Sequence, residues 1–232
     1  MFKKILIAED VDSVNLGVKQ LLEEFVTEDR IHHVQYCDDA LLKVKRAKID
    51  QEPFDLLISD LSFVENKFRE NKLNSGEELI EAVRREQPDI KVIVYSIETK
   101  PYVIRTLLEE MDCNAYINKS RESIRELKQA IRTIYASDEK FVSPELRYGK
   151  ADSELDEIDE QDIQIIRLLS KGFDQGEIAD DMHYSRSSIE KRINRLKTSL
   201  KAKNNPHLVS ISKDLGLSLI HISEPTRPLY NS

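Results

Sequence analysis

Five short apolar runs alternate with amphipathic stretches along the first 136 residues. The runs are KILIA (4–8), HVQYC (33–37), FDLLIS (54–59), KVIVYS (91–96) and AYIN (115–118). Between them, apolar residues recur at helical spacing, as at Leu79, Ile80 and Val83. Strands that alternate with helices indicate a parallel sheet, and runs that are apolar throughout indicate strands covered on both faces. The pattern predicts an α/β flavodoxin-like doubly wound domain of five parallel strands over residues 1–136.

The alternation stops after Ile134, and short stretches of helical spacing follow a polar segment. Residues 137–157 contain a proline, a glycine and mixed charge, and residues 152–162 contain seven acidic residues and no basic one. We interpret 137–157 as an acidic linker that runs into the first turn of a helix, where carboxylates suit the helix dipole. Residues 158–216 show helical spacing only, which predicts a small all-α domain of four helices.

The last sixteen residues differ from the rest. The segment LSLIHISEPTR (217–227) resembles the translation of a sequencing-library adapter, and a match of this length is rarely accidental. We interpret residues 217–232 as a non-native, adapter-derived tail that replaces the native sequence after about residue 216. A genuine short tail is the alternative. We assign these residues, His221 included, no function.

Composition narrows the class of protein. The 232 residues are 40% hydrophobic, which argues against a disordered chain, and the net charge of -8 argues against a uniformly basic surface. Cys37 and Cys113 form no CxxC motif, which indicates a reducing compartment and no structural zinc. No signal peptide or membrane span is evident. We therefore expect a cytoplasmic protein that does not associate with membranes.

Charged and polar residues stand at the ends of four predicted strands. Glu9 and Asp10 follow the first strand, Asp60 the third and Lys119 the fifth, while Ser96 ends the fourth. In the flavodoxin-like order 2-1-3-4-5 these carboxyl ends are adjacent, and ligands bind beyond them. Three adjacent carboxylates repel one another, and Mg²⁺ relieves that repulsion. A hydroxyl and an ammonium suit phosphoryl oxygens, so the set indicates phosphoryl transfer to a carboxylate.

Together with Tyr116, three residues before Lys119, this set resembles the receiver domain of bacterial two-component response regulators. The resemblance implies that a sensor histidine kinase phosphorylates Asp60, and that Ser96 and Lys119 contact the phosphoryl group. It implies that Tyr116 is the aromatic switch residue. It also implies a Mg²⁺ site formed by Glu9, Asp10, Asp60 and the backbone carbonyl of Ser62. Each residue alone has an ordinary alternative as a turn, strand-end, surface or core residue.

Two features depart from the usual receiver pattern. Gly76 lies sixteen residues after Asp60, so the loop over 61–76 contains an insertion. We expect the extra residues to form a flap or contact surface beside the phosphorylation site. The residue after Ser96 is Ile97, where the family usually has a small residue. We expect its branched side chain to shield the phosphoryl group from water and to slow dephosphorylation.

The strongest basic bias in this acidic chain lies in residues 184–203, which carry seven basic residues and one acidic residue. On a helical wheel Ile189, Ile193 and Leu196 share one face, and polar and basic residues share the opposite face. A helix of this kind suits the major groove of DNA. A solvated basic face is the ordinary alternative.

The segment 158–204 resembles the LuxR-type helix-turn-helix of the NarL/FixJ regulators. The resemblance rests on Phe173, on Glu177-Ile178-Ala179 and on Ser185 with Ile189-Glu190, although Asp159-Glu160 replaces the usual Thr-Pro opening. By position it implies base contacts from Glu190, Lys191 and Asn194. It implies phosphate contacts from Ser187, Ser188, Arg192, Arg195 and Lys197.

The sequence as a whole predicts a phosphorylation-controlled transcriptional regulator that binds double-stranded DNA as a homodimer when phosphorylated. We expect no enzyme activity beyond its own phosphorylation and dephosphorylation at Asp60. One alternative is a receiver that acts by docking to protein partners, with the helical domain as the docking module. Another is a phosphate-independent regulator in which the acidic residues are structural.

Overall fold

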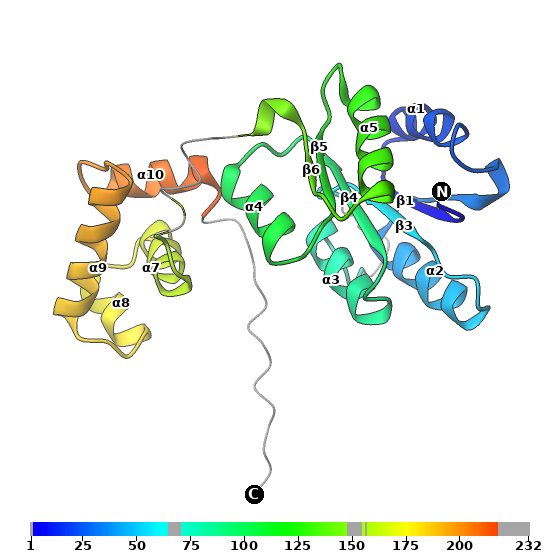
Figure 1. The fold of residues 1–232 in the computed structure, drawn as a ribbon. Coiled ribbons are helices and arrows are strands. Elements are labelled where there is room, and N and C mark those ends of the chain that lie inside the picture. The colour runs from blue at the N-terminus through cyan, green and yellow to red at the C-terminus, as the bar shows by residue number, and fades with distance from the viewer. Residues whose placement is uncertain (1, 65–70, 148–154, 156, 218–232) are drawn as a thin grey trace, which may run out of the picture. The chain divides into compact units, whose positions relative to one another are not determined.

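A computed structural model describes residues 2–64, 71–147, 155 and 157–217, apart from the side chains of residues 12–15. The chain divides into two compact units. One contains residues 1–99 and 104–147, and the other contains residues 148–232 together with 100–103. The first unit is the α/β part of Figure 1, and α7 to α10 belong to the second. Within the described residues, no helix has both the length and the apolar character needed to cross a membrane.

The first unit is built on a parallel sheet with the order β2-β1-β3-β4-β5-β6. The strands are β1 (Ile5–Ala8), β2 (Ile31–Val34), β3 (Leu56–Ser59), β4 (Lys91–Ser96), β5 (Ala115–Asn118) and β6 (Phe141–Val142). The flavodoxin-like order and the number of strands predicted up to β5 are confirmed. The second strand was placed too late, because β2 ends at Val34 and Cys37 begins α2 (Cys37–Ile49). Strands β1 and β3 are buried at every position because helices cover both faces.

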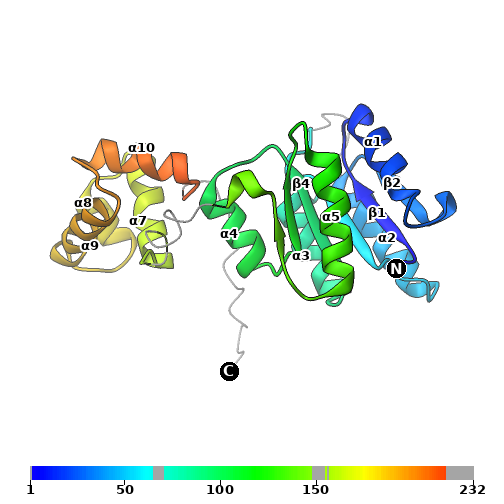
Figure 2. The same cartoon turned by 45° about the horizontal axis from the view of Figure 1, so that its top comes forward.

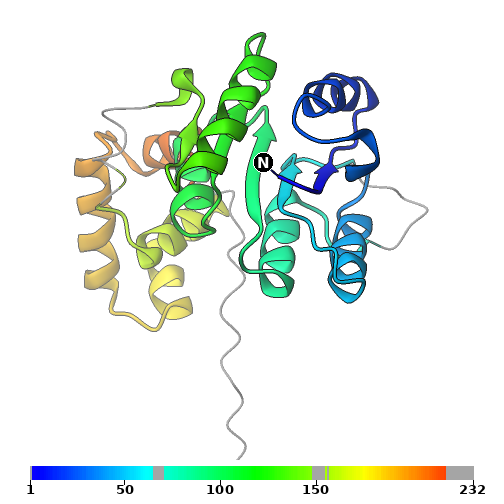
Figure 3. The same ribbon diagram turned by 45° about the vertical axis from the view of Figure 1, so that its right-hand side comes forward.

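Helices pack on both faces of this sheet. They are α1 (Asp12–Leu22), α2 (Cys37–Ile49), α3 (Gly76–Glu86), α4 (Pro101–Glu109) and α5 (Ser123–Ala136), with short 3-10 helices η1 (Glu28–Arg30) and η2 (Pro144–Leu146). Helices α1 and α5 lie together over one face (Figure 2). Helices α2 and α3 lie side by side on the opposite face (Figure 3). Ile5 and Ile7 of β1 pack with Leu22 of α1 and Ile131 of α5 in the core beneath the first pair.

Strand β6 was not predicted. Phe141 and Val142 pair with Ala115 and Tyr116 of β5, and the Ser143 amide extends the pairing by donating to the Tyr116 carbonyl at 2.9 Å. An apolar pair of two residues carries too little period to be recognised in sequence. Residues 141–146, which the sequence assigned to the linker, thus lie on the sheet edge as β6 and η2.

The loop after β3 is closed at its base. Ser62 and Ser75 form an isolated antiparallel bridge, and the Gly76 amide donates to the Leu61 carbonyl at 2.8 Å. A Cβ atom at Gly76 would lie 2.0 Å from the Asp60 carbonyl oxygen, so only glycine fits there. The inserted loop therefore leaves and re-enters the fold beside Asp60. Of the predicted flap over residues 61–76, residues 65–70 lie outside the described residues.

The second unit contains the four predicted helices, α7 (Glu160–Ser170), α8 (Gln175–Asp181), α9 (Arg186–Ser199) and α10 (Asn205–Leu215). Each begins after a residue whose side chain accepts a hydrogen bond from the first turn, namely Asp159, Asp174, Ser185 and Asn204. Their apolar faces share one core that includes Ile165, Ile178, Ile193 and Leu208. Leu217 is buried in that core, while residues 218–232 of the predicted tail lie outside the described residues.

Candidate functional site

Three carboxylates meet at the carboxyl ends of β1 and β3. Oxygen atoms of Glu9, Asp10 and Asp60 all lie within 4.8 Å of one another, and we call this set the acidic cluster. Glu9 and Asp60 are buried, whereas Asp10 is partly exposed. The parallel register places these residues together, because Ala8 of β1 pairs with Ser59 of β3. Closely spaced hard oxygen atoms are the ligands that a divalent cation prefers.

One cation of the protein lies inside this site. The Lys119 Nζ atom is 2.6 Å from a carboxylate oxygen of Asp60 and 2.6 Å from one of Glu9. Burial favours the neutral amine, but the two carboxylates outweigh burial and raise the pKa of Lys119 above its ordinary value. Burial raises the pKa of Glu9, and Lys119 only partly opposes that shift. One ammonium therefore does not balance three carboxylates.

The Asp60 carboxylate is held from two sides. Its Oδ1 atom accepts a hydrogen bond from the Leu61 amide at 2.6 Å, and its Oδ2 atom accepts one from Lys119. The Asp60 amide also donates to the Ala8 carbonyl at 3.0 Å, which ties the backbone to β1. The side chain is thus oriented and still carries lone pairs, as a carboxylate nucleophile requires.

Ser96 and Tyr116 lie on the two strands beyond β3. The Ser96 hydroxyl is buried and has no hydrogen-bond partner among the described residues. Tyr116 is fully buried, and its hydroxyl donates to the Glu98 carbonyl at 2.7 Å. Burial raises the pKa of Tyr116, so the phenol stays neutral. Ile97, next in the chain, is 71% exposed.

Two contacts at this site were not predicted. The Val64 amide donates to Asp10 Oδ2 at 2.7 Å, so the start of the inserted loop contacts the acidic cluster. His33 lies at the end of β2, and its Nε2 atom is 2.7 Å from the Glu9 carbonyl oxygen. A backbone amide leaves no signal in sequence, and the predicted strand 33–37 placed His33 at its start, whereas the structure places it near the carboxyl end of β2. The Ser62 residue, whose carbonyl was predicted as a metal ligand, lies in the bridge at the base of the loop.

Helix α9 has the two faces that the sequence predicted. Ile189, Ile193 and Leu196 are buried against the other helices, and polar residues cover the outer face. The exposed residues among the predicted DNA contacts are Ser187, Ser188, Glu190, Lys191, Asn194 and Arg195. Ser188 also takes part in the helix cap, since its amide donates to the Ser185 hydroxyl at 3.2 Å.

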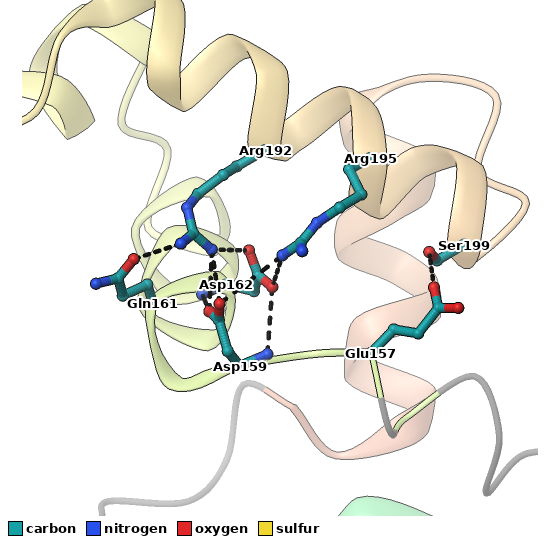
Figure 4. Close-up of polar contacts among 7 residues, drawn as sticks. All are labelled: Glu157, Asp159, Gln161, Asp162, Arg192, Arg195 and Ser199. Carbon is teal, nitrogen blue, oxygen red and sulfur yellow. Dashed lines mark hydrogen bonds and ion pairs between the residues drawn. The ribbon is translucent and has the colours of Figure 1, made fainter.

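Two of the predicted phosphate contacts, Arg192 and Arg195, form ion pairs within the helical unit. Arg192 and Arg195 extend from α9 toward the start of α7, where they meet Asp159 and Asp162 (Figure 4). We call these four residues the arginine cluster. Lys197, a third predicted phosphate contact, lies on α9 and is partly buried. The predicted phosphate role of these residues stays a prediction.

No family model matches the chain. Among curated proteins, it is 24% identical over 211 residues to the response regulator protein VraR of Staphylococcus saprophyticus, covering 89% of this chain and 94% of that protein. It is also 24% identical over 221 residues to the oxygen regulatory protein NreC of Staphylococcus carnosus, with the same coverage.

Solved structures share the fold. The RcsB response regulator of Salmonella typhimurium matches with a TM-score of 0.63 and 20% identity, covering 91% of this chain and 99% of that one. A structure of two RcsB dimers bound to two parallel DNAs matches with a TM-score of 0.60 and 19% identity, covering 92% and 98%. The chain is therefore similar over about nine-tenths of its length to response regulators, and it shares their fold of a receiver unit followed by a small helical unit.

Proposed function

We propose that this chain is a DNA-binding transcriptional regulator controlled by phosphorylation of Asp60, with a sensor histidine kinase as the phosphoryl source. The observation that carries the proposal is the surroundings of Asp60. An oriented carboxylate lies beside two other carboxylates and the Lys119 ammonium. The chain's own chemistry is limited to phosphorylation and dephosphorylation of that residue.

The acidic cluster fits Mg²⁺. Glu9, Asp10 and Asp60 supply hard oxygen ligands, and we propose the Ser62 carbonyl as a further one. A cation held by these residues would screen the repulsion among the carboxylates and would attract phosphoryl oxygens. Asp10 keeps a second oxygen for the metal while its Oδ2 atom accepts from Val64. Lys119 balances the remaining charge and positions the Asp60 oxygen.

The buried Ser96 hydroxyl gives the site a way to sense the phosphoryl group. It has no partner among the described residues, and a donor of this kind is costly unless a ligand satisfies it. Phosphorylation adds about −1.5 to −2 charge units next to Lys119. We propose that Ser96 and Lys119 then bind phosphoryl oxygens and that Tyr116 follows, which changes the surface around β5. That change favours a homodimer, and two copies bind two DNA half-sites.

The outer face of α9 supplies the DNA contacts in this proposal. Glu190 and Lys191 are exposed on one turn of α9 and Asn194 on the next, and these side chains would contact base edges. Ser187 lies at the helix start, where hydroxyl and amide donors suit a phosphate, and Lys197 would add a phosphate contact. RcsB dimers have been solved bound to DNA, which supports a DNA partner for this fold.

The labelling of Asp60 tests the first half of the proposal. The full-length chain is incubated with acetyl phosphate, with and without Mg²⁺, and the mass of the protein is measured. We expect one added phosphoryl group in the wild type, only with Mg²⁺, and none in Asp60→Asn. The control is Asp50→Asn, which removes an exposed carboxylate at the end of α2 and should label as the wild type does. Equal labelling of Asp60→Asn would refute the proposal.

A further inference from the structure

The start of α7 and the middle of α9 are joined by a set of charged contacts. The Arg192 Nη1 atom lies 3.0 and 2.9 Å from the two carboxylate oxygens of Asp159 and 2.7 Å from Asp162 Oδ1. The Nη2 atom of Arg192 donates to the Gln161 side-chain carbonyl. Arg195 donates to the other oxygen of Asp162. Figure 4 shows both guanidinium groups turned toward the first turn of α7.

The arginine cluster is balanced in charge and closed to solvent at its centre. The Asp162 side chain is 0% exposed, while the side chains of Arg192 and Arg195 are 28% and 50% exposed. Asp162 Oδ2 also accepts from the Asp159 amide at 3.2 Å, as part of the α7 capping box. A buried carboxylate requires such full compensation. Both Asp162 oxygens therefore have partners within the protein.

The acidic segment before α7 also contacts the end of α9. The Ser199 hydroxyl, at the end of α9, donates to a Glu157 carboxylate oxygen at 2.9 Å. The acidic residues that open the helical domain thus contact α9 at three positions along its length, at Arg192, Arg195 and Ser199. This placement supplies a reason for the acidic segment beyond its fit to the α7 dipole.

Arg192 lies on a different side of α9 from the proposed base contacts, whereas Arg195 is four residues from Lys191 and lies near it around the helix. Arg192 and Arg195 are three residues apart, so they share one side of the helix, which faces α7. Lys191 and Asn194 are also three residues apart, and both are exposed. Arg192 is turned by about 100° from Lys191 and by about 160° from Glu190 and Asn194, while Arg195 is turned by only about 40° from Lys191.

We infer that Arg192 and Arg195 are positioning residues, which hold α9 against Asp159 and Asp162 and so orient the side chains that contact DNA. The inference rests on the proposed DNA binding by α9, and it removes both arginines from the set of phosphate contacts. Lys197 remains a phosphate contact and becomes the natural comparison.

Substitution of a carboxylate distinguishes a phosphate contact from a positioning residue, because the two roles predict opposite changes in DNA affinity. If Arg192 contacts phosphate, then removal of the Asp159 charge frees it and strengthens DNA binding. If Arg192 positions α9, the same removal weakens binding. Asp159→Asn keeps a good N-cap side chain, so the start of α7 is retained. Glu160→Gln is the matched control, because it removes an exposed charge from the same turn, on a side chain for which no arginine contact is described.

The experiment uses the full-length chain treated with acetyl phosphate and a duplex selected from a random-sequence pool by the wild type. Affinity is measured over a series of salt concentrations, and circular dichroism establishes that each variant is folded. We expect Asp159→Asn to weaken binding by about tenfold relative to Glu160→Gln, as for the loss of a charge-assisted hydrogen bond. An unchanged or strengthened affinity in Asp159→Asn relative to Glu160→Gln would overturn the inference.

The salt dependence supplies a second criterion. Lys197→Gln should reduce the slope of log affinity against log salt by about 0.9, the value for one phosphate contact. Arg192→Gln should weaken binding and leave the slope unchanged. A slope reduced by about 0.9 in Arg192→Gln would overturn the inference. Failure of the proposed function gives a different result, because the wild type then selects no duplex from the pool.

Discussion

The acidic cluster and the arginine cluster contain the same kinds of charge in different proportions. Three carboxylates share one ammonium at the edge of the sheet. In the helical unit two carboxylates meet two guanidinium groups. At the first site the buried hydroxyl of Ser96 has no hydrogen-bond partner among the described residues. At the second site both carboxylate oxygens of the buried Asp162 accept hydrogen bonds from arginine side chains. An excess of negative charge with a donor still available suits a ligand, and a balanced set suits a permanent contact between helices.

Removal of Asp162 should have the largest effect on stability. Asp162→Ala leaves Arg192 and Arg195 without their buried partner and removes one half of the capping box. We expect the free energy of unfolding of the helical unit to fall by about 3 kcal/mol or more, as when one partner of a buried ion pair is removed. Hydrogen exchange followed by mass spectrometry measures the stability of each unit separately. A loss below about 0.5 kcal/mol, the range of ordinary surface substitutions, would show that the arginine cluster does not stabilise the helical unit.

Removal of the Glu9 charge should raise the free energy of unfolding of the receiver unit, opposite to the effect of Asp162→Ala. The pKa of Glu9 lies above its ordinary value of 4.5, so the folded state binds this proton more tightly than the unfolded state does. Stability of the receiver unit therefore falls as the pH rises from about 4.5 through the raised pKa. Glu9→Gln has no such charge, so its advantage over the wild type should be smallest below pH 4.5 and should grow above it.

Denaturant unfolding over a pH series, without divalent cations, measures this difference. Asp50→Asn serves as the control, since Asp50 lies on the surface of the same unit. If Glu9→Gln is less stable than the wild type at neutral pH by the same margin as at pH 4, then Lys119 alone balances the acidic cluster.

Mg²⁺ should stabilise the receiver unit by a smaller amount. A ligand that binds only the folded state raises stability by about 2.7 kcal/mol at a hundred times its dissociation constant, and weak cation sites reach less than that. We expect Mg²⁺ to raise the melting temperature of the wild type and to have little effect on Asp10→Asn, because Asp10 is the partly exposed carboxylate of the cluster. Equal shifts in the two proteins would place the cation elsewhere.

The smallest effect should come from Ile97. Its side chain is 71% exposed, so it packs little against the rest of the receiver unit. We still expect Ile97→Ala to shorten the lifetime of the phosphoryl group, because water then reaches the site more easily. The measurement is the decay of phosphorylated protein after removal of acetyl phosphate, and an unchanged half-life would rule out shielding by this residue.

Much of the receiver unit was predictable because a parallel sheet fixes which strand ends are neighbours. Once the runs ending at Ala8 and Ser59 were recognised as strands, their register brought Glu9, Asp10 and Asp60 together. The lysine was predictable for the same reason, since it follows β5. The Val64 amide was not predictable, because a backbone donor in an inserted loop has no residue type that marks it.

The arginine cluster was missed for a different reason. The sequence places Asp159 and Asp162 three residues apart, and Arg192 and Arg195 three residues apart. Equal spacing on two amphipathic helices is a signal that their charged sides match. The resemblance, carried over by position, assigned Arg192 and Arg195 to DNA phosphates, whereas in the structure both side chains contact α7.

The central claim is that phosphorylation of Asp60 controls DNA binding, and one titration tests it most directly. Affinity of the full-length chain for the selected duplex is measured with and without acetyl phosphate, in the presence and absence of Mg²⁺, for the wild type and Asp60→Asn. We predict tighter binding only in the wild type and only when acetyl phosphate and Mg²⁺ are both present. Affinity that does not change on addition of both, or an equal increase in Asp60→Asn, would contradict the claim.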